Sequence, residues 1–393
     1  MRRAAIIILI TATLAAVLLS YCTRDSAAEP VEWLFEPPAG RETAELPSPV
    51  SAPVSEPEDP APPSFPAIPH ALGAGDSLAY YDKAAEEALG MLSDYGDPAT
   101  RLKIYLDSCS PMKIMLPGGV LGAVYYHGMS TPADALAKAS EKYALPPSSL
   151  SVQKPYISVY YRNLETGYEF GFNEAGIRDC ASLAKTPYLL AILKETDEHS
   201  GDGGRYDLSA EWAYDPGTMF RPGSGVIFEM DAGTKKTWRE LIGYAFTDSD
   251  NIAFSQLMYR FGYASYNSLV SSLGIKMSLD ERLMSAEDCG AVLAAAFDFI
   301  SGGSEYGSFM KDKMIEAKKQ NNLIGQCFSD VPVCHKYGWD VGAYHDSAIV
   351  LDEHPYVIVI MTDYDTGGAE ADRFFADTVE MIKDMHRVIH LGE

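Results

Sequence analysis

A strand pattern of β-branched and aromatic residues recurs at both ends of the carboxyl-terminal part of the chain. Residues 157–161 and 168–172 have this pattern, and the turn residues between them predict a hairpin. The pattern returns only at residues 331–338, 347–351 and 356–362. These five strands predict one antiparallel sheet that is built from both ends of a domain.

Helical periodicity fills the chain between the two groups of strands. Thr237 opens a helix with a capping box, and a second helix runs over residues 252–261. A last amphipathic helix is predicted over residues 370–389. The predicted fold class is therefore α/β of the α+β type, a five-stranded antiparallel sheet flanked by helices with an inserted all-helical lobe. The cleft between two such lobes is a natural substrate site.

The chain divides into four parts by composition. Residues 1–22 form a signal peptide or membrane anchor, and residues 23–71 are rich in Pro and Glu and predict a disordered, semi-rigid linker. Residues 72–150 are assigned to an accessory helical segment, and residues 151–393 to the domain with the five strands. The accessory segment has no motif that indicates a function.

Two helices are predicted in the accessory segment. One spans residues 78–92, and the other opens at Thr131 with Pro132 in the first helical position. They enclose an apolar, Gly-containing stretch at residues 115–126.

The amino terminus has the features of an export signal. Two arginines precede an uncharged stretch over residues 4–21, whose length lies between that of a signal peptide and that of a spanning helix. Residues 19–22 resemble the lipobox of bacterial lipoproteins, except that bulky Tyr21 precedes Cys22. Lipidation at Cys22, an uncleaved anchor and secretion stay open. Each of them predicts an extracytoplasmic protein, and the first two a protein tethered to a membrane.

The charge of the chain excludes one class of partner. A formal net charge of −24 leaves no basic stripe to bind phosphates, so no nucleic-acid partner is expected. Apart from Cys22 there are five cysteines, an odd number, so at least one thiol stays free. Cys327 and Cys334 flank a predicted turn and are the expected disulfide pair, whereas Cys109 and Cys289 fit buried thiols as well.

No metal site or cofactor is predicted. His386 and His390 lie one helical turn apart near the carboxyl end, where two solvated side chains explain them better than a pair of metal ligands.

Ser182 and Lys185 stand at the start of an apolar helical stretch. If the helix begins at Ser182, Lys185 lies one turn along on the same face. A hydroxyl becomes a good nucleophile when an adjacent base takes its proton, and a lysine with a depressed pKa can be that base. A helix cap and a lysine that extends to solvent would explain the same spacing.

Two further polar segments follow this motif along the chain. Ser249, Asp250 and Asn251 form a short loop between two apolar helices, where an ordinary helix cap is the alternative explanation. Lys336 is followed closely by Gly338 on the first returning strand, which lets a substrate backbone approach the sheet beside an ammonium group. An exposed lysine on an edge strand is the alternative there.

In this order the three segments resemble the Ser-x-x-Lys, Ser-Asp-Asn and Lys-Thr-Gly motifs of class A β-lactamases and penicillin-binding proteins. The resemblance runs from about Tyr156 to the carboxyl end. Residues 172–173, 223–227 and 344–346 support it. It implies a serine hydrolase that forms an acyl-enzyme with a β-lactam or a peptidoglycan-like peptide, needs no metal or cofactor, and is expected to be a monomer.

The resemblance also assigns roles to the site residues. Ser182 is the nucleophile, Lys185 takes its proton, and Ser249, supported by Lys336, relays a proton to the leaving nitrogen. Asn251 binds the substrate amide. Residues 337–339 (Tyr337, Gly338, Trp339) line the substrate, with the N–H groups of Ser182 and Trp339 holding the oxyanion.

Two departures from the family pattern affect the expected function. Tyr337 stands where the family has a Thr or Ser hydroxyl that helps to hold the substrate carboxylate. The loop that carries the deacylating glutamate in class A β-lactamases is short here, and neither Glu281 nor Asp280 fits the pattern of that residue. We therefore expect β-lactam hydrolysis with slow deacylation. A D-alanyl-D-alanine peptidase and a non-catalytic cell-envelope binding protein are the alternatives.

Overall fold

The computed structural model describes residues 72–73, 97–108, 112–118, 120–125, 132–153, 156–199, 204–219, 221, 223–317, 322–363 and 369–390. The predicted export signal, the linker and the predicted helix at residues 78–92 lie outside these ranges. Among the helices in these ranges, none combines the length and the apolar character that crossing a membrane requires.

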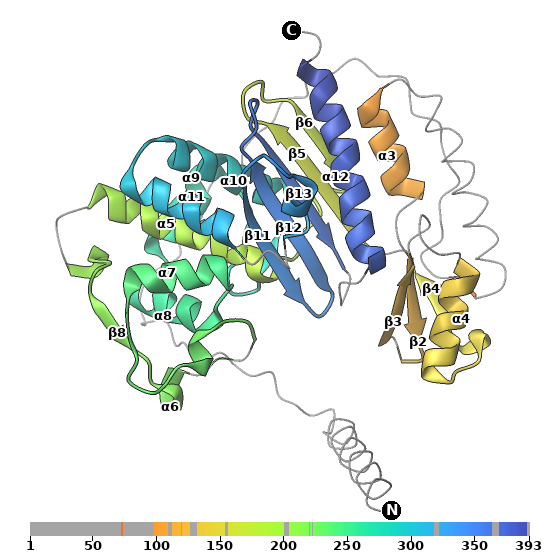
Figure 1. Ribbon diagram of the computed structural model, residues 1–393, viewed down its shortest axis with the longest axis horizontal. Coiled ribbons are helices and arrows are strands. Elements are labelled where there is room, and N and C mark those ends of the chain that lie inside the picture. The colour runs from red at the N-terminus through yellow and green to blue at the C-terminus, as the bar shows by residue number, and fades with distance from the viewer. Residues whose placement is uncertain are drawn as a thin grey trace, which may run out of the picture. The chain divides into compact units, whose positions relative to one another are not determined.

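A five-stranded antiparallel sheet forms the centre of the fold, as predicted (Figure 1). Its order is β11–β12–β13–β5–β6, and the pairing of β13 with β5 joins the two ends of the domain. The strands are β5 (Ile157–Asn163), β6 (Glu169–Phe172), β11 (Val333–Asp340), β12 (Ala343–Val350) and β13 (Tyr356–Thr362). Strand β12 begins earlier than predicted. The sequence pattern did not show this start because the first half of the strand is polar, yet these polar side chains are buried in the structure.

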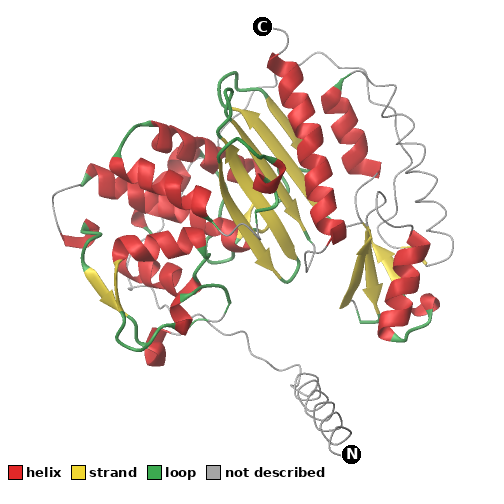
Figure 2. Ribbon diagram, viewed as in Figure 1, coloured by secondary structure: helices red, strands yellow, loops and turns green. Residues whose placement is uncertain are grey.

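Helices cover both faces of the sheet (Figure 2). Tyr160 on β5 faces α10, where a Cβ on Gly290 would lie 2.1 Å from the Tyr160 ring, so the helix can approach this closely only with glycine. The next residue, Tyr161, points to the opposite face and packs against His386 of α12. Alternation along one strand therefore separates a face covered by the helical lobe from a face covered by α12.

The lobe between β6 and β11 is helical, as predicted, and its described residues also form two short ribbons. One ribbon pairs β7 (Arg178–Asp179) with β10 (Leu283–Met284), and the other pairs β8 (Glu211–Ala213) with β9 (Lys235–Thr237). The main helices are α5 (Lys185–Glu198), α7 (Trp238–Thr247), α8 (Asn251–Phe261), α9 (Ala264–Leu273), α10 (Ala286–Ser301) and α11 (Glu305–Glu316), and the chain closes with α12 (Ala369–His390). The predicted capping box at Thr237 and the predicted closing helix are confirmed.

The segment before β5 contains strands as well as helices, so the prediction of a helical segment at residues 72–150 was wrong in part. A second sheet has the order β1–β4–β2–β3, and its β2–β3 hairpin turns at Gly118 with a φ of +83°. Periodicity cannot distinguish a short apolar run in a strand from one in a helix. The elements are β1 (Leu72–Gly73), α3 (Pro98–Ser108), β2 (Met112–Leu116), β3 (Val120–Tyr125), α4 (Pro132–Tyr143) and β4 (Ser151–Gln153).

This segment packs on the main sheet domain, and residues 67–393 form one compact unit. The Tyr105 ring on α3 stacks on Phe374 of α12 with 6.1 Å between the ring centroids. Lys113 on β2 forms an ion pair of 3.3 Å with Asp363, directly after β13. The predicted start of α4 at Pro132 is confirmed.

Two sequence predictions about side chains were wrong. Cys327 and Cys334 are free thiols, and their sulfurs point to different carbonyls, those of Leu323 and Lys311. Proximity in sequence does not orient two Cβ atoms toward each other. His386 is buried rather than solvated, and its Nδ1 lies 2.7 Å from the Tyr161 hydroxyl.

Candidate active site

Ser182 lies in a 3-10 turn, residues 181–184, that leads directly into α5. The α-helix begins at Lys185, three residues later than predicted. Residues i and i+3 eclipse in a 3-10 helix, so Ser182 and Lys185 still project to the same side. Ser182 is partly exposed, whereas Lys185 is 3% exposed. The pair thus combines a reachable hydroxyl with a buried amine.

The backbone just before Ser182 is held in a strained conformation. Ala181 has a φ of +46°, in the left-handed region that residues with a Cβ rarely adopt. The Ala181 N–H donates to the Asp179 carboxylate at 2.8 Å, and the Cys180 N–H donates to the Arg282 carbonyl at 2.7 Å. Such a conformation persists where surrounding bonds fix it. These two bonds fix the turn that carries Ser182.

Arg282 connects this turn to the sheet. Its guanidinium donates to Asp179 at 2.7 Å and to Asp340 at the end of β11 at 2.5 Å. The Asp179 carbonyl also accepts a bond from His345 Nε2 on β12 at 2.8 Å. The side chains of Arg282, Asp340 and His345 together hold residues 179–182 against the edge of the sheet. Nothing in the sequence indicated Arg282, and the sequence analysis placed His345 only within a supporting stretch, because no sequence signal places either residue beside Asp179.

His345 carries out this role as a neutral ring. The Thr362 N–H donates to its Nδ1 at 3.1 Å, so Nδ1 is unprotonated and Nε2 carries the hydrogen given to Asp179. Burial is the main cause that lowers the pKa of His345. The ring is therefore a fixed donor near neutral pH.

The amino group of Lys185 reaches across to the loop between α7 and α8. It donates to the Ser249 carbonyl at 2.5 Å, to the Ser249 hydroxyl at 3.1 Å and to Asn251 Oδ1 at 2.8 Å. Burial lowers the pKa of Lys185 from 10.5 to about 7, with a smaller opposing effect of the Asp250 carboxylate and a smaller lowering effect of Arg282. A substantial fraction of Lys185 is therefore neutral at neutral pH, as a base must be.

The Ser249 hydroxyl lies between two amino groups. Lys336 on β11 donates to it at 2.9 Å from the other side and also bonds the Tyr337 carbonyl at 2.8 Å. Burial, followed by the charge of Lys185, lowers the pKa of Lys336 well below its ordinary value, and Asp346 on the neighbouring strand opposes this shift. The Ser249 hydroxyl thus accepts a hydrogen bond from each of the two amino groups.

The loop that carries Ser249 is fixed by Asp250. The Asp250 carboxylate caps α8 by accepting from the Ala253 N–H, and it accepts two more N–H groups from residues 226–227. These bonds hold Ser249 at a φ of +52°. Ser224, which the sequence analysis placed only within a supporting stretch, donates to the Ser249 carbonyl at 2.6 Å.

Strand β11 packs closely against the turn that carries Ser182, and the residue at the contact is Gly338. A Cβ there would lie 2.7 Å from the Cys180 carbonyl oxygen and 3.1 Å from the Leu183 side chain. Glycine is therefore required for close packing against the turn, and not only for access of a substrate, as the sequence analysis suggested. Trp339, the next residue, is 52% exposed at the same edge.

Tyr337 covers Lys336 on its outer side. Its ring centroid lies 4.2 Å from the Lys336 amino group, and its hydroxyl lies 3.5 Å from the Asp248 carbonyl. The side chain is buried, with 7% exposure. The phenol thus fills space beside the ammonium group and directs its own hydroxyl toward the backbone.

Neither candidate for a deacylating base joins this cluster. Glu281 and Asp280 are both exposed in the loop before β10. The backbone N–H of Glu281 donates to the Ser278 hydroxyl, and Asp280 lies beside the Tyr263 phenol. The predicted residues that the structure does bring together are Lys185, Ser249, Asn251, Lys336 and Tyr337, with Ser182 one 3-10 turn before Lys185 and Gly338 packed against that turn.

Comparisons with solved structures give the same fold. A β-lactamase from Sphaerobacter thermophilus matches with a TM-score of 0.51 and 17% identity over 60% of this chain and 92% of its own. A class A β-lactamase representative from Bacteroides cellulosilyticus matches with a TM-score of 0.52 and 21% identity over 60% and 93%. A mutant of PBP-A, solved as an acyl-enzyme complex with penicillin G, matches with a TM-score of 0.51 and 18% identity over 59% and 90%.

The sequence comparison is more specific about the family. No curated protein matches the chain. The family model described as the Beta-lactamase enzyme family matches residues 148–385, which include Ser182, Lys185, Ser249 and Lys336. The chain therefore belongs to the Beta-lactamase enzyme family.

Proposed function

We propose that the protein is a serine hydrolase that opens β-lactam rings through a covalent ester on Ser182 and releases the product slowly. The observation that carries this proposal is the Ser249 hydroxyl, which lies 3.1 Å from the amino group of Lys185 and 2.9 Å from that of Lys336. Ser182 lies one 3-10 turn before Lys185 and is partly exposed. This arrangement supplies a nucleophile, a base and a proton relay.

We infer the acylation step from this arrangement. Neutral Lys185 takes the Ser182 hydroxyl proton while the oxygen attacks the lactam carbonyl carbon. The N–H groups of Ser182 and Trp339 hold the oxyanion. When the carbon–nitrogen bond breaks, the proton passes from Lys185 through the Ser249 hydroxyl to the leaving nitrogen, and Lys185 is neutral again. Lys336 stabilises the hydroxyl during this relay, and Asn251 binds the substrate amide.

Release of the product requires a base beside the ester. Water must attack the Ser182 ester, and a positioned base typically contributes about 10²- to 10⁴-fold in rate. Glu281 and Asp280 are exposed and stand apart from the bonds that connect Lys185, Ser249 and Lys336. Slow deacylation is therefore part of the proposal.

A D-alanyl-D-alanine peptidase or penicillin-binding protein is the second candidate. The same acylation machinery serves it, and the position of Glu281 and Asp280 favours a long-lived acyl-enzyme. The predicted export and tether would place either enzyme near peptidoglycan. A binding protein without catalysis would gain nothing from two buried lysines, because burying an ammonium group costs several kcal/mol.

The first prediction concerns the nucleophile. Incubation with penicillin G should increase the intact mass of the protein by the mass of one penicillin, and Ser182→Ala should abolish the increase. Ser151→Ala is the matched control, because Ser151 starts a second Ser-x-x-Lys spacing on strand β4 and should leave labelling unchanged. Labelling of Ser182→Ala to the wild-type extent would show that another residue is the nucleophile.

The second prediction concerns pH. Lys185 is a base only when it is neutral, and its pKa is about 7, so the acylation rate constant should rise as the pH increases through about 7 and then level off. Burial is the main cause of this low midpoint, while the Asp250 carboxylate raises the pKa and Arg282 lowers it further. Stopped-flow acylation by a chromogenic β-lactam measures the profile. A rise only near pH 10 would contradict a depressed pKa at this lysine.

The third prediction concerns turnover. A chromogenic cephalosporin should give a burst of about one equivalent followed by a steady rate at least about tenfold slower, because acylation outpaces hydrolysis. Glu281→Gln and Asp280→Asn should each change the steady rate less than about twofold. Fast turnover without a burst, or a steady rate that falls about 100-fold in Glu281→Gln, would overturn the proposal of slow deacylation.

A further inference from the structure

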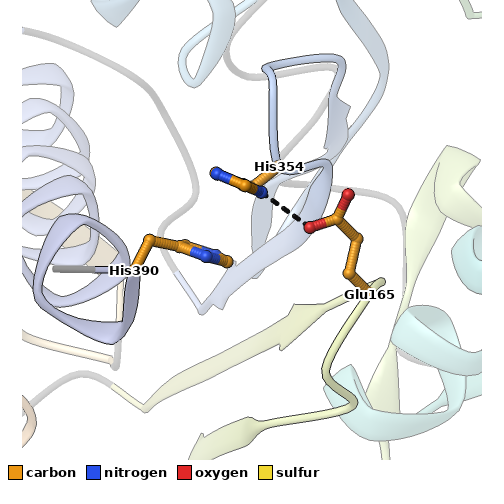
Figure 3. A group of neighbouring side chains, drawn as sticks. All are labelled: Glu165, His354 and His390. Carbon is orange, nitrogen blue, oxygen red and sulfur yellow. Dashed lines mark hydrogen bonds and ion pairs between the residues drawn. The ribbon is translucent and has the colours of Figure 1, made fainter. Parts of the chain in front are cut away.

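Three segments meet at an end of the main sheet and bring together two histidines and a glutamate (Figure 3). Glu165 lies in the turn between β5 and β6, His354 in the turn between β12 and β13, and His390 at the end of α12. One ligand atom of each residue lies within 4.8 Å of the other two. Figure 3 shows Glu165 turned toward His354, and the rings of His354 and His390 are stacked with 3.8 Å between their centroids.

The contacts within this group hold the side chains in place. His354 Nδ1 lies 2.7 Å from the Glu165 carboxylate. Asn163, which is fully buried, uses its Oδ1 to accept the N–H groups of Glu165 and Thr166, both at 2.9 Å. One buried side chain therefore shapes the turn that presents the carboxylate.

Asn163 also sets the protonation of His390. Because its Oδ1 accepts two backbone N–H groups, its amide nitrogen is the atom that faces His390 Nε2, at 2.7 Å. This nitrogen has two hydrogens and donates to Nε2, which is therefore unprotonated. An unprotonated ring nitrogen is the form in which histidine binds a metal.

An open pocket of about 430 Å³ gives access to both histidines from solvent. Acidic residues Asp330, Asp352 and Glu353 line it together with Lys383 and Arg387. The two cations form ion pairs along their own helix, Lys383 with Glu380 at 2.8 Å and Arg387 with Asp384 at 3.0 Å. The pocket thus presents carboxylates to a cation that enters it.

We propose that Glu165, His354 and His390 bind a divalent transition-metal ion of the Zn²⁺ type. Two imidazole nitrogens and one carboxylate oxygen are a ligand set that suits Zn²⁺, with water in the fourth position. Ligand atoms of a tetrahedral zinc ion lie about 3.3 Å apart, so the separations here must shorten by up to about 1.5 Å. The two stacked imidazole rings must also rotate, so that a nitrogen of each points at the ion. The ion takes the place of the hydrogen that His354 shares with the Glu165 carboxylate. At His390 Nε2 it takes the place of the hydrogen bond from the Asn163 amide.

This site is separate from the Ser182 chemistry. Tyr161 and Tyr356 pack against His386 on the face of the sheet that α12 covers. Lys336, in contrast, donates to Ser249 in the helical lobe, which covers the opposite face of the sheet. The ion would tie the end of α12 to two turns of the sheet and so stabilise the fold, and it would take no part in acylation.

Titration calorimetry with Zn²⁺ on the full chain in mild detergent tests the proposal. Wild type should bind one equivalent at this site, and His354→Gln and His390→Gln should each weaken that binding at least about tenfold. His199→Gln is the matched control, because His199 forms a similar ion pair with Glu195 on α5 without a second histidine, and it should bind as wild type does. Co²⁺ should give the intense visible bands of a four-coordinate ion in wild type and His199→Gln alone.

A second measurement makes the result independent of folding defects in a variant. Zn²⁺ should raise the Tm of wild type and leave that of a folded His354→Gln, His390→Gln double variant unchanged, while penicillin labelling of Ser182 stays equal in both. No binding by wild type, or wild-type affinity in both single variants, would overturn the site. Loss of penicillin labelling in the double variant would overturn its separation from the chemistry.

Discussion

The burial of two lysine side chains around one hydroxyl is the constraint on which the rest of the site depends. An ammonium group removed from water costs several kcal/mol, so each lysine needs either partners or a lost proton. Lys185 has three hydrogen-bond partners and a pKa near 7, and Lys336 has two partners. The negative charges of Asp250 and Asp346 oppose part of the cost. The desolvation that costs free energy in the folded state also lowers the pKa of Lys185, as the proposed role of base requires.

The surrounding fold maintains this arrangement through strained backbone at fixed points. Ala181, Ser249 and Arg282 all have a positive φ, which non-glycine residues adopt only where neighbours hold them. Ala181 is held through Asp179, and Ser249 through the bonds of Asp250. Two of these strained positions are Ser249 itself and Ala181, the residue directly before Ser182.

Much of the fold was predictable from the sequence, because strands with β-branched runs and helices with capping signals carry local information. The five-stranded sheet and the closing helix follow from such patterns. The hairpin at residues 112–125 was missed because a short apolar run fits either element, and the start of β12 because its polar residues are buried in this fold. Local patterns do not encode which polar residues a fold will bury.

The site was predictable to the extent that motifs order its residues along the chain. The structure brings Lys185, Ser249 and Lys336 into hydrogen-bond contact, and their catalytic roles stay predictions. The contacts of Arg282 and His345 could not be found in this way, because only the tertiary structure brings these residues to Asp179. The cluster at His390 was missed because Glu165 and His354 are distant from it in sequence.

A direct titration of Lys185 tests the central claim, that a buried lysine is neutral enough at neutral pH to activate Ser182. NMR of protein labelled with ¹³C at the lysine ε-carbon follows each amine, and Lys185→Gln assigns the signal by its loss. The account predicts a midpoint near pH 7 for Lys185, well below that of exposed lysines. A midpoint near pH 10 would show that Lys185 stays charged at neutral pH and would contradict its role as the base.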